Sequence, residues 1–270
     1  MTELLLLFLM GLIGGFLAGL IGIGGGVMYI LVLPYLLSGM GFPQEEIVQY
    51  TIANSIFGTM FAAMAGNITH IRQRFFFWKE VLVIGLLGTI ASISTLHFFV
   101  NTDAYQQSEF NIAVICIMIF IAFRTMIQVK KPSGGNYEKQ PAIPLLSAIG
   151  LSAGTISALS GLGGGTVIIP VLNSGLKMTM QKAKSISLGV IFITALALTI
   201  FNLNEVPMSE FRNQNTGYIV WPLALTISLG VILGSPLGVA VSKKLSNKVI
   251  SIIFVLFVFV VIIDKALQLF

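Results

Sequence analysis

The sequence predicts an all-α polytopic membrane protein built from two inverted repeats, each a re-entrant, glycine-broken hairpin followed by three transmembrane helices. Three observations carry this prediction: an apolar composition, a glycine motif that occurs twice, and the distribution of charge between apolar segments. Of the 270 residues, 56% are hydrophobic and 9% are charged, and the mean hydropathy is +0.96. Soluble domains carry about 25% charged residues, so this composition excludes a soluble domain.

Stretches free of Asp, Glu, Lys and Arg mark the membrane segments, since a bilayer core of about 30 Å needs about 20 apolar residues in a helix. The first half is expected to hold a hairpin over 4–37 and helices within 47–71, 81–102 and 110–123. The second half is expected to hold a hairpin over 141–176 and helices within 185–204, 213–242 and 249–263. The polar stretch "VKKPSGGNYEKQP" at 129–141 is typical of an exposed linker. The predicted repeats are therefore 1–128 and 142–270.

The two halves resemble each other in sequence. The segment "GIGGGVMYILVLP" at Gly22 returns as "GLGGGTVIIPVLN" at Gly161. Two further matches follow in the same order: "TIANSIFG" from Thr51 with "AKSISLGV" from Ala183, and "IGLLG" from Ile84 with "GVILG" from Gly230. Weak internal symmetry of this kind is typical of transporter folds, and it indicates an internal duplication.

The basic residues predict the topology. They cluster in 67–80, 124–140, 177–184 and 243–248, which the positive-inside rule places in the cytoplasm. Because 124–140 and 177–184 then lie on one side, the chain between them must enter the membrane and return. Three crossings after each hairpin invert the second half relative to the first. We expect a multi-pass protein of the plasma (inner) membrane, with 129–141 cytoplasmic, both termini outside, and only Arg212 and Lys265 among the basic residues outside.

The glycines fall into two kinds. Four-residue spacing places Gly11, Gly15 and Gly19 on one helix face, and likewise Gly230, Gly234 and Gly238, which predicts close helix packing. The contiguous triplets Gly24–Gly26 and Gly163–Gly165 make no face but free the backbone. Inside a bilayer, irregular backbone must face protein or a water-filled cavity. A helix that starts after each triplet would point free N–H groups and its positive end at the motif, which favours an anion; the alternative is a tight turn without a ligand.

The candidate anion-binding residues come from the motifs and from polar positions on the helices that follow. They are Gly24, Gly25, Gly26, Val27, Asn54, Ser55, Ser160, Gly163, Gly164, Gly165, Thr166, Ser185 and Ser187. The short polar side chains could donate to an oxyanion, or could instead form bonds between helices. His70 is expected at the membrane interface, in a loop, and the centre is expected to be free of charge. The sequence offers no catalytic constellation, no metal-ligand cluster and no nucleotide motif, so we expect no catalytic residue, metal or cofactor.

Paired G-x-G-G-G motifs, each followed by an apolar run and a small-residue patch, resemble the TauE/SafE sulfite exporter family, also called TSUP. The resemblance covers 4–265. It implies a membrane carrier of small sulfur-containing or organic anions, such as sulfite and sulfonates.

The leading hypothesis is therefore a secondary transporter, an exporter of a small anion such as sulfite or an organosulfonate, that works by alternating access. A passive anion channel lined by the same dipoles is the alternative, and an intramembrane enzyme or an assembly factor is disfavoured by the lack of catalytic groups. The expected partners are the anion and the lipid bilayer but not nucleic acid. A homodimer is left open, because glycine seams serve internal packing as well as dimers.

Overall fold

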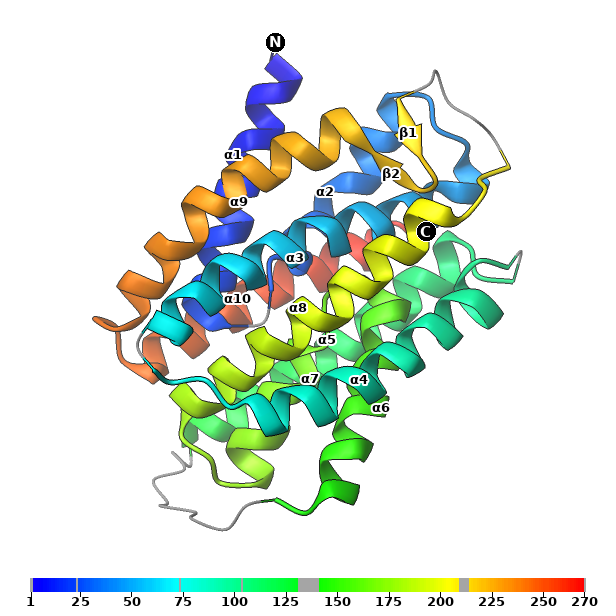
Figure 1. Cartoon of the computed structure of the whole chain (residues 1–270). Helices are drawn as coiled ribbons and strands as arrows, with labels where there is room; N and C mark the ends of the chain where they lie inside the picture. Colours follow the sequence, from blue (N-terminus) through cyan, green and yellow to red (C-terminus); the bar gives the residue numbers. More distant parts are fainter. Residues whose placement is uncertain are drawn as a thin grey trace.

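The computed structural model describes residues 2–22, 24–72, 74–102, 104–130, 141–208 and 214–269. The first half contains α1 (Thr2–Ile21), α2 (Gly26–Gly39), the 3-10 turn η1 (Gln44–Glu46), α3 (Ile47–Arg72), α4 (Trp78–Thr95), the π-helical turn η2 (Leu96–Val100) and α5 (Gln107–Lys130). The second half contains α6 (Ile143–Ser160), α7 (Gly165–Pro170), the π-helical turn η3 (Val171–Gly175), α8 (Met180–Asn204), β1 (Asn215–Thr216), β2 (Ile219–Val220), α9 (Trp221–Ser242) and α10 (Asn247–Leu267) (Figure 1). Most of the predicted linker 129–141 lies outside the described residues.

The predicted all-α polytopic membrane architecture is confirmed. Seven of the described helical stretches are long and apolar enough to cross a bilayer. Large apolar side chains on the outer helices are exposed, among them Ile90 of α4, Leu229 of α9 and Leu256 of α10. Exposed apolar surface on this scale is what a lipid-facing perimeter requires.

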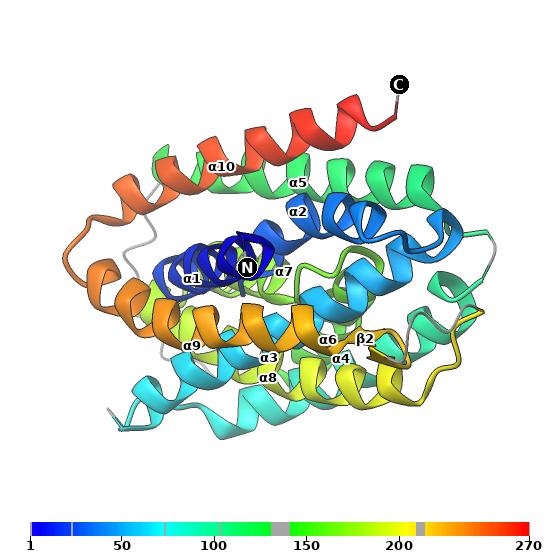
Figure 2. The ribbon, with the colours of Figure 1, turned by 90° about the horizontal axis from the view of Figure 1, so that it is seen from above.

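The helices α3 and α8 form the centre of the molecule. Most of α3 is buried, whereas α10 is largely exposed. The two central helices approach closely at Gly66, where a Cβ would lie 2.8 Å from the Leu188 side chain. The Asn67 amide donates to the Leu188 carbonyl oxygen at 3.0 Å and so bonds α3 to α8. Figure 2 shows α5 and α10 side by side along one edge, outside this centre.

The predicted glycine faces pack against each other along α1 and α9. A Cβ at Gly15 would lie 2.6 Å from the Val231 carbonyl oxygen, and a Cβ at Gly238 would collide with the Phe16 carbonyl oxygen. The two backbones are therefore in direct contact, which only glycine allows here. An equivalent seam joins α4 to α6, where the Ser92 hydroxyl donates to the Gly154 carbonyl oxygen at 2.9 Å.

The helix contacts of the two halves come in matched pairs. The α1–α9 seam corresponds to the α6–α4 seam, with each broken helix packed on the fourth helix of the other half. The contact of α3 with α9 corresponds to that of α8 with α4. The contact of α10 with α2 corresponds to that of α5 with α7. Each half therefore supplies helices that pack mainly on the other half.

A polar cluster ties α10 to α2 at the end of the chain. The Tyr35 hydroxyl donates to Asp264 at 2.7 Å, and Gln268 bonds both Tyr35 and Asp264. The Lys265 side chain is fully buried, with its ammonium 3.3 Å from the Asp264 carboxylate and 3.1 Å from the Gln268 side-chain oxygen. The buried lysine charge thus has a carboxylate beside it, as buried charges require.

One predicted membrane segment begins differently. A helix was expected within the stretch 213–242, and α9 lies there, but a two-stranded antiparallel ribbon precedes it, pairing Asn215 with Val220 and Thr216 with Ile219. Gly217, at φ +55°, makes the turn between the strands. The ribbon and its turn supply bonding partners for the Asn54 side chain.

The α1–α9 seam gives a direct stability prediction. Gly15→Ala places a methyl group against the α9 backbone and should lower the apparent melting temperature of the purified protein, since overpacking costs about 1–3 kcal/mol. The matched control is Gly39→Ala at the end of α2, where a Cβ would meet nothing within 4 Å. Equal melting temperatures for the two variants would contradict the seam.

Candidate functional site

The two glycine motifs break their helices as predicted. The helix α1 ends at Ile21, and Gly22 and Gly24 take φ values of +86° and +82°. In the second half, α6 ends at Ser160, and Gly161 and Gly163 take +66° and +79°. L-residues rarely adopt this left-handed region, so the alternate glycines of each motif reverse the chain. The helix α2 then begins at Gly26, and the short helix α7 begins at Gly165.

The two motifs touch each other. A Cβ at Gly26 would lie 2.5 Å from the Gly161 carbonyl oxygen and 2.8 Å from the Leu162 Cα. The first residue of α2 therefore packs directly on the backbone of the second motif. The structure thus brings together residues that are far apart in the chain, as expected for a single site between the two halves.

Two of the predicted serines brace the motifs from the central helices. The Ser55 hydroxyl of α3 donates to the Gly161 carbonyl oxygen at 2.8 Å, and the Ser187 hydroxyl of α8 donates to the Gly22 carbonyl oxygen at 3.2 Å. Each serine side chain thus bonds the motif of the opposite half. Both hydroxyl groups lie within hydrogen-bonding distance of motif carbonyl oxygens, which favours the alternative of bonds between helices.

The other predicted hydroxyl residues divide into two groups. Ser160 donates to the Ile156 carbonyl oxygen at 2.6 Å and accepts from the Leu162 N–H at 3.3 Å, and Thr166 donates to the Gly163 carbonyl oxygen at 3.3 Å. Both therefore lie in the second motif. Ser185 instead donates to the Phe75 carbonyl oxygen at 2.7 Å. This hydrogen bond fixes the chain between α3 and α4 and does not involve a motif residue.

Asn54 is buried, and its side-chain amide nitrogen and oxygen both have hydrogen-bond partners. Its amide nitrogen donates to the carbonyl oxygens of Tyr50, at 2.7 Å, and Tyr218, at 2.9 Å. Its side-chain oxygen accepts from the Val220 N–H at 3.0 Å. Asn54 therefore anchors the β1–β2 ribbon to α3. This arrangement favours the interhelical alternative over a role as an anion donor.

Sequence reasoning missed two hydroxyl side chains beside the first motif. The Tyr29 ring of α2 occupies space that glycines leave free, because a Cβ at Gly14 or Gly25 would lie 2.7–2.8 Å from its hydroxyl end. The Thr59 side chain of α3 lies against Gly24. Both hydroxyl groups are buried and have no hydrogen-bond partner within the described part of the chain. Only the tertiary contacts reveal them, since neither stands out in an apolar helix.

A cavity of about 600 Å³ reaches the first motif. It is lined by Gly19, Gly22, His70, Met180, Gln181, Lys184, Leu188, Val239, Ser242 and Lys243. Its charged residues are basic, and they come from α8 and from the turn after α9. A concave site lined by one sign of charge concentrates ions of the opposite sign. We call this space the basic cavity.

The basic cavity corrects two sequence predictions. Lys184 was expected in a cytoplasmic loop, but α8 begins at Met180 and carries Lys184 inward, where its ammonium donates to the Leu20 carbonyl oxygen at 2.9 Å. A half-buried charge therefore lies close to the end of α1, beside the first motif. His70 was expected in a loop, but it belongs to the last turn of α3 and is 8% exposed. Its Nδ1 is buried without a partner in the described residues.

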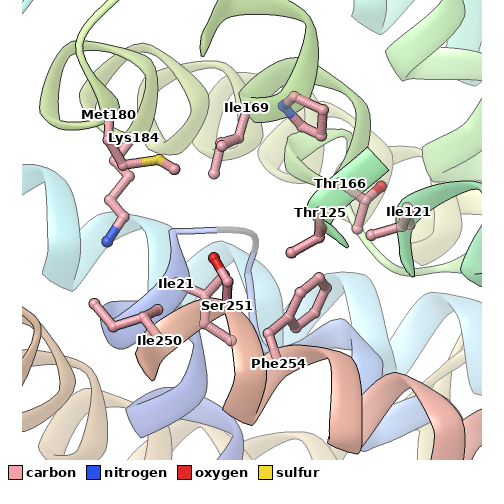
Figure 3. Close-up of a pocket in the computed structure, with 11 residues that line it drawn as sticks. Ile21, Ile121, Thr125, Thr166, Ile169, Met180, Lys184, Ile250, Ser251 and Phe254 are labelled. Atoms are coloured by element: carbon pink, nitrogen blue, oxygen red, sulfur yellow. The ribbon is translucent and has the colours of Figure 1, made fainter. Parts of the chain in front are cut away.

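A second, smaller pocket of about 40 Å³ adjoins the second motif. It is largely apolar, with Ile169, Ile250 and Phe254 among its lining residues, and it also contains Thr166 and Lys184. Figure 3 shows Lys184 and Met180 approaching this pocket from one side, and Thr166 and Thr125 from the other. We call this space the inner pocket. Its walls come from α7, α8, α5 and α10, together with Ile21 of α1.

The groups gathered around the two motifs are mostly hydrogen-bond donors. Among the described residues, no group of three or more His, Cys, Asp or Glu side chains could hold a metal ion. The available groups are backbone N–H groups at the start of α2, buried hydroxyls and lysine ammonium groups. All of these can donate hydrogen bonds to an oxyanion.

The apolar helices, the paired motifs and the basic cavity are features of a membrane transporter. The sequence profile of the family described as sulfite exporter TauE/SafE matches residues 6–264. The chain belongs to this family.

The chain is also similar to curated proteins of several microbes. A probable membrane transporter protein of Methanocaldococcus jannaschii is 30% identical over 245 residues, which cover 90% of this chain and 88% of that protein. Probable membrane transporter proteins of Haemophilus influenzae and Bacillus subtilis are 26% and 22% identical, with coverage of 99% and 93% of both chains in each pair. No solved structure matches the chain significantly.

The hydrogen bonds of Asn54 predict that replacing this residue lowers stability. Asn54→Leu leaves the Tyr218 carbonyl and the Val220 N–H unpaired and should destabilise the fold, at about 1–3 kcal/mol for each buried polar group. A lower midpoint of denaturation in detergent checks this. Asn204→Leu is the control, because Asn204 is exposed and its amide bonds only the Ile200 carbonyl one turn earlier. A stable Asn54→Leu variant that no longer binds an anion would instead place Asn54 in the site.

Proposed function

We propose that this protein is a secondary transporter that exports a small anion, such as sulfite or an organosulfonate. One observation carries the proposal: a basic cavity leads to a glycine motif whose backbone leaves helical geometry inside an apolar helix bundle. The description of the family as a sulfite exporter family supports the choice of anion.

The anion is held by backbone N–H groups at the contact between the motifs. The first N–H groups of a helix have no partner within the helix, and the helix N-terminus carries a partial positive charge of roughly half a unit. At the start of α2, these groups are contributed by Gly24, Gly25, Gly26 and Val27. The second motif contributes Gly163, Gly164, Gly165 and Thr166. Backbone N–H groups carry only partial charges, so this part of the site can bind an anion weakly enough to release it.

Alternating access follows from two inverted repeats, 1–128 and 142–270, that rock against each other. The matched contacts between the halves support this division, because each broken helix packs on the other half. The motif contact lies where the halves meet, so relative movement would open the site to one side and then the other. Transporters with inverted repeats bind their substrates at such positions.

The basic cavity is lined by residues of segments that the charge pattern assigns to the cytoplasm. Its lining includes Lys184 and Lys243, which belong to the segments 177–184 and 243–248 that the positive-inside rule places in the cytoplasm. An anion entering from the cytoplasm therefore meets the basic cavity first. This orientation supports export, with both termini outside and the linker 129–141 inside, in the plasma membrane.

Transport by proteoliposomes tests the proposed function. Purified protein should give saturable sulfite or organosulfonate uptake, and Gly164→Val should reduce it at least about tenfold, a loss of roughly 1.4 kcal/mol. A Cβ at Gly164 would lie 3.1 Å from Ala153, so a larger side chain disturbs the second motif. Gly39→Val is the control, since a Cβ there meets nothing within 4 Å.

Uptake equal to wild type in a folded Gly164→Val variant would contradict the proposed site. Large single-channel currents in place of slow, saturable flux would identify a channel instead of a carrier.

Sided labelling tests the orientation. Single cysteines are introduced at the exposed positions Glu45, Lys177 and Lys244 after the native Cys116 is replaced by serine. A membrane-impermeant maleimide applied to intact cells should label Glu45→Cys only, whereas Lys177→Cys and Lys244→Cys should require broken cells. Labelling of Lys177→Cys in intact cells would overturn the re-entrant second hairpin.

A further inference from the structure

Lys184 lies between the two cavities of the site. Its side chain lines both the basic cavity and the inner pocket, and Met180, one turn earlier on α8, is the other residue that they share. The basic cavity reaches the first motif at Gly22, whereas the inner pocket lies against Thr166 of the second motif. The Lys184 side chain therefore borders both spaces, one beside each motif.

The present partner of Lys184 is a neutral group. Its ammonium donates to the Leu20 carbonyl oxygen at 2.9 Å, in the last turn of α1. The ion pairs within the described residues join other lysines, Lys182 to Glu80 and Lys265 to Asp264. Burying part of an ammonium group without a counter-ion raises its free energy. A bound anion at this position would lower it.

We propose that Lys184 receives the transported anion and passes it from the basic cavity to the inner pocket. The ammonium exchanges the Leu20 carbonyl for the anion, because a hydrogen bond between two charged groups is stronger than one to a neutral acceptor. Lys243 and His70 line the same cavity, but neither is acidic, so neither offers the Lys184 ammonium a counter-ion in place of the anion. This inference rests on the proposed function and names the residue that selects for negative charge.

The exchange also links binding to the fold. The Lys184–Leu20 bond joins α8, in the second half, to the end of the broken helix α1 in the first half. When the anion takes the ammonium, the end of α1 loses this bond. The loaded and empty proteins then differ in one contact between the halves that move in alternating access.

A purely structural role makes a different prediction. A lysine near the C-terminal end of a helix can cap its last carbonyl groups without contacting any ligand. Removing such a cap would lower stability but would leave the anion affinity of the folded protein unchanged. Affinity and stability therefore have to be measured on the same variants.

The test is charge rescue at position 184, with binding of radiolabelled sulfite to the purified protein as the readout. Lys184→Cys is made in the Cys116→Ser background, so that it carries the only thiol. Reaction with 2-bromoethylamine rebuilds a lysine-like ammonium through a thioether that sulfite does not cleave, whereas iodoacetamide adds a neutral group. Each product is measured by thermal melting and by sulfite affinity.

We expect Lys184→Met and the iodoacetamide product to bind sulfite about 10- to 100-fold more weakly, as for loss of a hydrogen bond to a charged group. Aminoethylation should restore most of the affinity. Lys182→Met is the matched control two residues away, because Lys182 pairs with Glu80 at 3.6 Å and lies outside both cavities. It should bind sulfite as wild type does.

Two results would overturn the inference, and they differ in what else they overturn. Wild-type affinity in folded Lys184→Met, or equal affinity of the neutral and aminoethylated products, would show that Lys184 does not bind the anion. Neither result would contradict the proposed function. Failure of the wild-type protein to bind sulfite or any organosulfonate would overturn both the role of Lys184 and the proposed function. If Lys184→Met does not fold, the comparison of the two cysteine products decides the question.

Discussion

The structure depends on satisfying backbone that leaves helical geometry inside a membrane. Each unpaired N–H or C=O group exposed to hydrocarbon costs several kcal/mol, and the two glycine motifs create a series of such groups at the centre of the bundle. Ser55 and Ser187 bond carbonyl oxygens of Gly161 and Gly22, and the motifs pack on each other where a Cβ at Gly26 would not fit. Carbonyl oxygens of both motifs are thus bonded by side chains of the central helices, and the proposed anion would bond N–H groups at the start of α2.

The bracing crosses between the halves, and this has consequences for the whole molecule. The hydroxyl on α3 bonds the second motif, the hydroxyl on α8 bonds the first, and the glycine seams place each broken helix on the fourth helix of the other half. A movement of either half therefore changes the surroundings of both motifs. The surroundings already differ: the first motif adjoins the basic cavity of about 600 Å³, and the second adjoins the inner pocket of about 40 Å³. This difference between two matched motifs is compatible with the proposed alternating access.

The features that sequence reasoning predicted correctly are local. A four-residue glycine spacing defines a helix face whatever that face packs on, and contiguous glycines break a helix wherever it lies. The features it missed depend on tertiary contacts. Asn54 bonds a small ribbon that the apolar pattern of 213–242 conceals. Lys184 was counted with the loop charges, because the sequence does not show that α8 begins four residues earlier and turns this side chain inward. Tyr29 and Thr59 resemble ordinary helix residues until the glycines around them are placed.

The central claim is that an anion binds where the basic cavity meets the glycine motifs, and anomalous diffraction tests it most directly. Selenite is a pyramidal oxyanion like sulfite, and its selenium scatters anomalously. Crystals soaked in selenite should give a selenium peak within hydrogen-bonding distance of the Lys184 ammonium or the first motif, and the peak should fade when excess sulfite is added. A selenium peak confined to exposed residues such as Lys244, at a selenite concentration that saturates transport, would contradict the account.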